Sequence, residues 1–234
     1  MNARWGIAVV AFVTIPTAAF GQGSVGNGTF QNLSLQEGSL PVITMPAHMI
    51  YVPFVPAFPG WTGSIDGVQP SQVLLNSPPS PGISIELYGA VIPTAFPPIG
   101  NEFTVMLSSY YHSSTVVSLS QSGMVPAGAE TLQIKIGEAN PGLWILSLGG
   151  QSVSMAPITV TPGYTLYQGN VSSFAGKIEN LAITAQPSLV GGANLVTFCD
   201  ITFQGISVPE PGTFLHLGLG ALLLFRRGWT TPRR

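Results

Sequence analysis

Residues 143–155, LWILSLGGQSVSM, predict a β-hairpin and indicate the fold class of the chain. Apolar residues precede Gly149 and Gly150, and apolar residues alternate with serine after them. Two successive glycines accept the positive φ angles that a tight turn between antiparallel strands requires. We therefore expect neighbouring antiparallel strands on both sides of this turn.

Three further stretches have the period of two that is typical of strands with one buried face. Their apolar positions are Ile83, Ile85 and Leu87; Phe103, Val105 and Leu107; and Leu132, Ile134 and Ile136. The residues between them are expected on a mostly polar face. Proline-rich breaks at residues 76–81 and 97–98 end strands. We expect an all-β fold, a jelly-roll-like β-sandwich over residues 22–207.

Charge is scarce and unevenly placed. Charged residues make up 7% of the chain, against about 25% in an average soluble domain. All five arginines lie near the two ends, and residues 22–211 hold two lysines and nine acidic residues, a net charge of −7 with histidine neutral. A body of this charge repels phosphate groups, so we expect neither nucleic acid nor anionic lipid headgroups as partners.

The N-terminal segment, residues 1–21, has the pattern of a secretory signal peptide. Arg4 precedes an apolar stretch, and the small residues Ala19 and Gly21 fit the positions before a signal-peptidase cut at Gln22. Pro16 interrupts the apolar run, which is too short for the ~20 residues of a membrane span. We expect the protein to be exported.

The C-terminal segment, residues 208–234, combines a Pro-Glu-Pro motif, an apolar run and a basic cluster. The apolar run covers residues 214–225 and is expected to form a hydrophobic helix. As a helix it spans about 18 Å, which is short of the ~30 Å hydrocarbon core of a bilayer. Basic residues that follow such a run stay in the cytoplasm. We therefore expect the tail to hold the protein at a membrane only temporarily, for a processing enzyme.

This tail resembles the PEP-CTERM sorting signal of Gram-negative bacteria, although His216 inside the apolar run departs from the usual pattern. The resemblance implies that an exosortase-type processing enzyme recognises the tail, and that the membrane is contacted only through the tail before processing. The implied destination is the cell surface or the extracellular matrix, and an ordinary C-terminal membrane span is the alternative. The matching residues are Val208, Pro209, Glu210, Pro211, Arg226 and Arg227.

The body resembles the carbohydrate-binding-module-like jelly rolls that are common in PEP-CTERM proteins. The resemblance is carried by residues 27–38, 58–76, 143–155 and 196–203. In related jelly rolls, acidic residues on the opening and closing strands hold a structural calcium ion. Here Gln36 stands in place of an opening glutamate, and Cys199 precedes Asp200 where two acids are expected. Asp200 is therefore a weak calcium candidate, and no other cofactor is expected.

Motifs for catalysis are absent from the sequence. There is no Gly-x-Ser-x-Gly, no His-Glu-x-x-His and no phosphate-binding loop. His48 and His112 have no metal-ligand spacing, and the single cysteine, Cys199, is expected in the core without a disulfide. A glycosidase needs a carboxyl pair, for which the candidates are Asp66, Glu86, Glu102 and Asp200. We expect no catalytic residues and no enzymatic activity.

Aromatic residues are the clue to a ligand, because sugar rings stack on aromatic faces. Trp61 is expected in the core. Tyr88, Tyr110 and Tyr111 are expected to be exposed and form the candidate glycan platform, while Trp144, Tyr164 and Tyr167 are further aromatic candidates. The expected function is structural, adhesive or glycan-binding, with an extracellular polysaccharide as partner. The alternatives are a secreted glycan-active enzyme and, last, an outer-membrane β-barrel.

Overall fold

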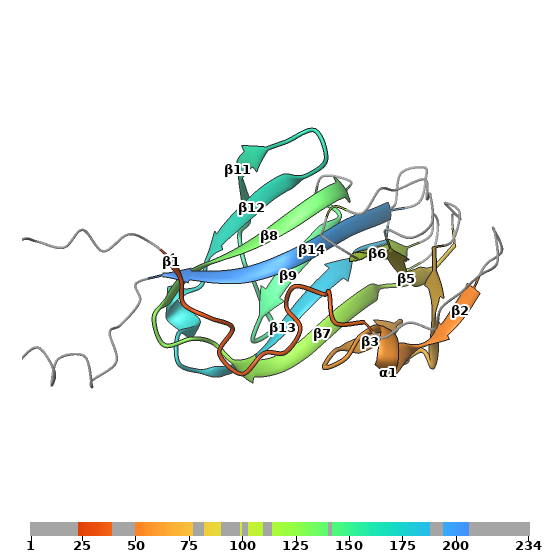
Figure 1. The fold of residues 1–234 in the computed structure, drawn as a ribbon, viewed down its shortest axis with the longest axis horizontal. Helices are drawn as coiled ribbons and strands as arrows, with labels where there is room; N and C mark the ends of the chain where they lie inside the picture. The colour runs from red at the N-terminus through yellow and green to blue at the C-terminus, as the bar shows by residue number, and fades with distance from the viewer. Residues whose placement is uncertain are drawn as a thin grey trace, which may run out of the picture.

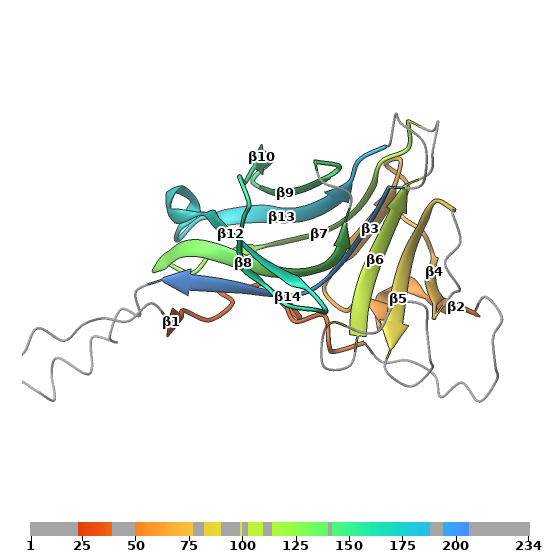
Figure 2. The ribbon, with the colours of Figure 1, turned by 90° about the horizontal axis from the view of Figure 1, so that it is seen from above.

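A computed structural model describes residues 23–38, 50–76, 82–89, 99, 103–109, 114–139, 142–187 and 194–205. This part of the chain is almost entirely β-structure in two sheets that face each other (Figures 1 and 2). The sequence-based prediction of an all-β fold is confirmed. The predicted signal peptide and C-terminal hydrophobic helix lie outside the described residues.

The larger sheet of the described residues has nine strands. Along its main path these are β11 (Ala156–Val160), β12 (Thr165–Asn170), β8 (Ala129–Ala139), β14 (Asn194–Gly205), β6 (Phe103–Ser109), β5 (Ser84–Gly89), β4 (Gln72–Leu75) and β2 (Ile50–Pro53), with β1 (Gly23–Ser24) paired to β14. Neighbouring strands are antiparallel except for β4 and β5, which are parallel. In Figure 2 the sheet curls, so that β6, β5, β4 and β2 run across the direction of β8 and β14.

The smaller sheet has five strands within the described residues. In order these are β10 (Gln151–Ser152), β9 (Trp144–Leu148), β13 (Ile178–Ala185), β7 (Val117–Met124) and β3 (Thr62–Ile65). Short helical turns, α1 (Phe54–Ala57) and η1 (Ser172–Phe174), lie between strands. The predicted hairpin is confirmed, because β9 pairs with β10 across a turn in which Gly149 has φ 60° and Gly150 has φ 76°.

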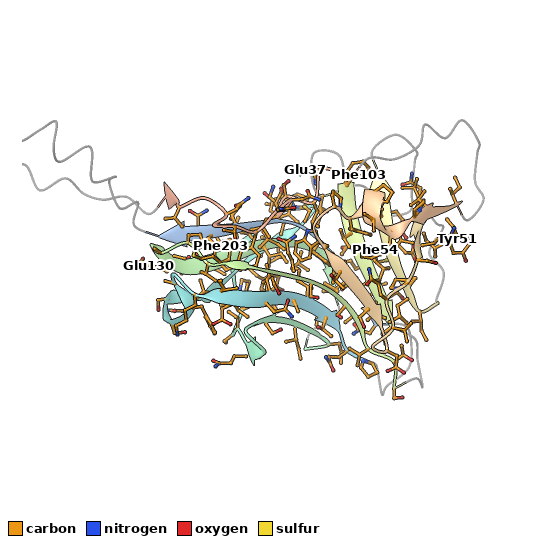
Figure 3. The ribbon with its side chains drawn as sticks, turned by 90° about the horizontal axis from the view of Figure 1, so that it is seen from below. Glu37, Tyr51, Phe54, Phe103, Glu130 and Phe203 are labelled. Carbon is orange, nitrogen blue, oxygen red and sulfur yellow. The ribbon has the colours of Figure 1, made fainter. Side chains whose placement is uncertain are left out.

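The core fills the space between the two sheets. Leu132, Ile134 and Ile136 of β8 are buried there, as the period of two predicts. Phe54 and Phe203 lie among the side chains that crowd this space (Figure 3), and Phe203 stacks on Phe30 with ring centroids 5.6 Å apart. Burial of apolar area of this kind is the main stabilising term of the fold.

The N-terminal segment, residues 25–38, contributes to the core without forming a long strand. Leu33 and Leu35 are buried, and the main chain bonds to β14, where Ile201 N donates to Leu33 O at 3.0 Å. Gln121 of β7 anchors the same segment, since its side chain donates to Gln31 O and accepts from Gln31 N at 2.6 Å. One glutamine thus ties this segment to the smaller sheet.

The polar sides of β5 and β6 differ from the sequence-based prediction. Ser84, Glu86 and Tyr88 were expected on an exposed face, yet all three are buried, as are Thr104 and Ser108 of β6. These strands lie between β14 and β4 inside the larger sheet, and Ile99 donates from its backbone to Thr104 Oγ1 on this face. Period-two alternation reports which residues share a face, but it does not show whether the second face is covered.

Candidate functional site

Three neighbouring strands, β12, β8 and β14, present a polar outer face to solvent. The even-numbered apolar residues of β8 point into the core, so Gln133 and Lys135 point outward, as does Thr131, whose hydroxyl oxygen is itself buried. Pairing register places Gln168 and Thr202 beside Gln133. In Figure 1 no described element crosses in front of this part of the sheet. We name this surface the amide face and define it by Thr131, Gln133, Lys135, Gln168, Asn170, Asp200, Thr202 and Gln204.

Amide and hydroxyl groups dominate this surface. Gln133 Nε2 donates to Gln168 Oε1 at 2.8 Å. This bond uses one donor and one acceptor, which leaves the Gln133 carbonyl and the Gln168 amide group without a partner among the described residues. Each is partly exposed. The pair therefore offers both an acceptor and donors to a ligand, at fixed positions on adjacent strands.

A single ion pair lies at the edge of the amide face. Lys135 Nζ is 2.7 Å from Asp200 Oδ2, with the two side chains 29% and 23% exposed. Lys135 also lies over the ring of Tyr164, 5.1 Å from the centroid. The hydrogen bond to Asp200 raises the pKa of Lys135. Because each charge is matched by the other, the face has no unpaired charge to attract an ionic ligand, and such an exposed pair contributes at most about 1 kcal/mol.

The candidate glycan platform is corrected by the position of Tyr88. Its side chain is fully buried, and its hydroxyl donates to Glu86 Oε2 at 2.7 Å. Burial and the neighbouring carboxylate raise the pKa of Tyr88. A ring that is closed off from solvent cannot stack on a sugar. The other two platform residues, Tyr110 and Tyr111, lie outside the described residues.

The other aromatic residues divide between core and surface. Trp61 is buried, as predicted, and its indole N–H donates to Asn32 O at 3.2 Å. Trp144 and Tyr167 are partly buried and meet edge to face, with centroids 5.3 Å apart. Tyr164 is partly exposed beside Lys135. Tyr164 is therefore the aromatic side chain at the amide face.

Glu86 forms a separate buried cluster with its two neighbours on β5. Its carboxyl accepts hydrogen bonds from Ser84 Oγ at 2.5 Å and from Tyr88 OH at 2.7 Å. Burial raises the pKa of Glu86, and the two hydrogen bonds only partly oppose that effect. The cluster supports the interior of the sheet and offers no accessible carboxylate.

The calcium candidate Asp200 is engaged by protein groups. Its carboxylate is bonded to Lys135, which supplies the neighbouring positive charge. Gln36 accepts from Phe103 N and donates to Phe103 O, both at 2.9 Å, and so ties the N-terminal segment to β6. Within the part of the chain that the structure describes, no group of three or more His, Cys, Asp or Glu could hold a metal ion.

Cys199 is buried, as the sequence indicates, but it lies outside the cluster of core side chains between the two sheets. It is fully buried and unpaired. Burial, with the carboxylate of Asp200 as the next cause, raises the pKa of its thiol to about 12. The thiol is therefore protonated at neutral pH and is a poor nucleophile.

Of the four acids considered as glycosidase candidates, the three that the structure describes lie in three different settings. Glu86 is buried in β5, Asp200 is bonded to Lys135, and Asp66 lies in the turn between Ile65 and Val68, next to β3 of the other sheet. Glu102 lies outside the described residues, as do His48, His112 and every residue of the predicted sorting and signal-peptidase sites. The helices in the described part of the chain include none with the length and hydrophobicity of a membrane-spanning segment.

The sequence did not identify the amide face. Alternation in residues 132–136 already assigned Gln133 and Lys135 to the polar side of a strand. The missing information was the identity of the neighbouring strands. Gln168 of β12 and Thr202 of β14 follow Gln133 of β8 by 35 and 69 residues, and pairing at that range leaves no local signal in the sequence.

Comparison with known proteins gives little further information. No protein-family model matches the chain, and no curated protein matches it. A solved structure with partial similarity is the enzymatically active domain of tailspike protein 4 of bacteriophage CBA120, with 15% identity and a TM-score of 0.36. The match covers 63% of this chain and 19% of that one.

The expectation that the protein has no enzymatic activity is corrected by this comparison. The similar domain is described as enzymatically active, which contradicts the expectation. A likeness at this TM-score carries no argument for a particular activity of this chain.

Proposed function

We propose that this is an exported, cell-surface or matrix-associated protein whose amide face binds an uncharged polysaccharide. The observation that carries the proposal is the amide face itself. It presents amide groups from three adjacent strands, the hydroxyl of Thr202, a partly exposed tyrosine and no unpaired charge. Sugar hydroxyls both donate and accept hydrogen bonds, and amide side chains match both roles.

The charge of the body supports an uncharged ligand over an acidic one. Between the two ends there is no arginine to make bidentate bonds to sulfate or carboxylate groups. Lys135 is already bonded to Asp200. The ligand would be held by hydrogen bonds to the amide face and by stacking on Tyr164. A jelly-roll-like module of the carbohydrate-binding kind fits this role, and that sandwich type is part of the proposal.

The amide face is tested by removing the two bonded glutamines. The double substitution Gln133→Ala and Gln168→Ala removes the central amide pair and leaves the core residues of both strands in place. Gln72 and Gln151 are exposed strand glutamines elsewhere in the molecule, so their double alanine variant is the matched control. Migration of each protein is measured in gels that contain hydroxyethylcellulose, galactomannan or dextran.

The expected result is retardation of the wild type and of the control in at least one of these gels, and loss of retardation in the Gln133/Gln168 variant. Equal retardation of both double variants would place binding elsewhere on the molecule. Migration of the wild type without retardation in every gel would contradict the polysaccharide ligand.

The route to the surface is a second part of the proposal. It rests on the signal-peptide pattern around Ala19 and Gly21 and on the PEP-CTERM-like tail. An exosortase-type enzyme would process the tail, after which the protein no longer contacts the membrane. The intact mass of the protein from its own host tests this proposal. We expect a mass that corresponds to a chain starting at Gln22 and lacking the basic tail. A mass that corresponds to a chain still ending at Arg234 would contradict tail processing.

A further inference from the structure

The two sheets end on the same side of the molecule in two exposed strands. β10 is the edge of the smaller sheet and β11 the edge of the larger one, and only three residues join them. All five residues of β11 are exposed, including Ile158 at 47% and Val160 at 77%. In Figure 1 the β11–β12 hairpin stands at the upper margin of the molecule. β11 therefore presents an open, partly apolar strand edge.

This side of the molecule lacks the charges that usually protect an open edge. Proteins protect exposed edge strands from pairing with a further strand by charged residues, by proline or by β-bulges. β11 has Pro157 and a bulge between Pro157 and Thr159, so its last residues, Thr159 and Val160, are the part of this edge that can pair. Residues 139–176, which include β9, β10, β11 and β12, contain no charged side chain, and no charge-free stretch of the chain is longer. The net charge of −7 on the body is therefore carried elsewhere, and two copies that meet at this edge avoid direct like-charge contacts.

The backbone of β11 is oriented for pairing at Val160. Thr161 N donates to Tyr164 O at 2.9 Å, and Val160 and Thr165 form the next pair along the hairpin. Hydrogen-bonded and non-hydrogen-bonded pairs alternate in an antiparallel ladder. The N–H and C=O of Val160 consequently point away from β12, where a further strand can bond to them.

We propose that β11 is a self-association edge, which pairs with β11 of a second copy of this chain about a two-fold axis. Antiparallel pairing centred on Val160 sets the Val160 residues of the two copies opposite each other, so that each backbone N–H donates to the other's C=O, clear of the bulge between Pro157 and Thr159. Apolar cross-strand pairs of this kind stabilise a sheet. A two-fold contact is complete with two copies, because each uses the same edge, so the assembly stops at a dimer. The nine-stranded sheets of two molecules thereby continue into each other.

The test compares two substitutions at Val160 with a matched control. Val160→Lys places a charge at the pairing edge, and Val160→Pro removes the outward-pointing N–H without adding charge. Ile178→Lys is the control, because Ile178 is 78% exposed and lies on β13, which is paired on both sides. Sedimentation velocity of the full chain in one mild detergent is measured from sub-micromolar to high micromolar concentration, at low and high salt.

Wild type and Ile178→Lys are expected to dimerise, and more tightly at high salt, because salt screens the repulsion between two acidic bodies. Both Val160 variants are expected to weaken the dimer at least about tenfold, which corresponds to ~1.4 kcal/mol. Val160→Lys lowers the net negative charge, so general electrostatics alone would favour association and cannot explain a loss.

A wild type that stays monomeric at every concentration would overturn the proposal. Dimers of equal strength in both Val160 variants would also overturn it, because association would then depend on another surface or on the tail. Thermal unfolding of each variant, followed by circular dichroism, establishes that a monomeric variant is folded. If one of the two Val160 variants is unfolded, the dimer strength of the other variant decides the outcome.

Discussion

Glu86 is a buried titratable residue in the interior of the larger sheet. Its carboxyl is buried and its pKa is raised above the ordinary value of 4.5. The folded protein therefore favours the neutral form of this carboxyl more than the unfolded chain does. The resulting stabilisation is fully present below the unfolded pKa and is lost as the pH rises through the folded pKa.

Glu86→Gln is expected to stabilise the protein at neutral pH. The carboxamide is neutral at every pH and keeps hydrogen-bonding groups beside Ser84 and Tyr88. We expect the variant to exceed the wild type in free energy of unfolding by on the order of 1 kcal/mol at pH 8, with a smaller difference near pH 4. Urea unfolding at the two pH values measures this, and a difference that grows toward low pH would be inconsistent with a raised pKa.

Cys199 is expected to be unreactive in the folded protein. Its thiol is buried and its pKa is raised to about 12, so the thiolate that attacks alkylating reagents is scarce at pH 8. Mass spectrometry after incubation with iodoacetamide should find unmodified native protein and full modification in urea. Rapid modification of the native protein would show that β14 opens or that the thiol is accessible.

At the scale of elements, Gly63 sets how closely β3 approaches α1 and β5. A Cβ atom at this position would lie 2.3 Å from a ring carbon of Phe54 and 2.8 Å from Ile85 Cδ1. Both of those side chains are buried in the core between the sheets. Because Gly63 has no side chain, the two sheets can approach each other closely in this region.

Gly63→Ala is expected to destabilise the protein by about 1–3 kcal/mol, the usual cost of overpacking a core. Gly163 is the matched control, because a Cβ there meets no atom within 4 Å and alanine should change stability little. Thermal unfolding of both variants tests this comparison. An unchanged midpoint for Gly63→Ala would mean that Phe54 and Ile85 move aside at no cost.

Elements were predicted well where the evidence for them is local. The Gly149-Gly150 turn and the buried face of β8 follow directly from neighbouring residues, and both are confirmed. Strand order and the cover over β5 depend on contacts between distant segments. For that reason the sequence placed Tyr88 on the surface, although it is buried, and did not bring Gln133 and Gln168 together.

At the scale of the whole molecule, the distribution of charge separates three regions. The amide face has a self-compensating ion pair, the β10–β11 side has no charge over residues 139–176, and the remaining acidic residues give the body its net charge. A surface without unpaired charge binds through hydrogen bonds and stacking, and its affinity depends weakly on salt because docking releases no counterions. These properties define the central claim, that the protein binds an uncharged polysaccharide.

The most direct test is a titration of the full protein against neutral and acidic polysaccharides, at low and high salt and with or without EDTA. Calorimetry would compare galactomannan and hydroxyethylcellulose with alginate. We expect binding to a neutral polymer with an affinity that changes little with salt and is unaffected by EDTA. Binding to alginate alone, abolished by EDTA, would contradict the account and would point to calcium held at Asp200 and neighbouring acids.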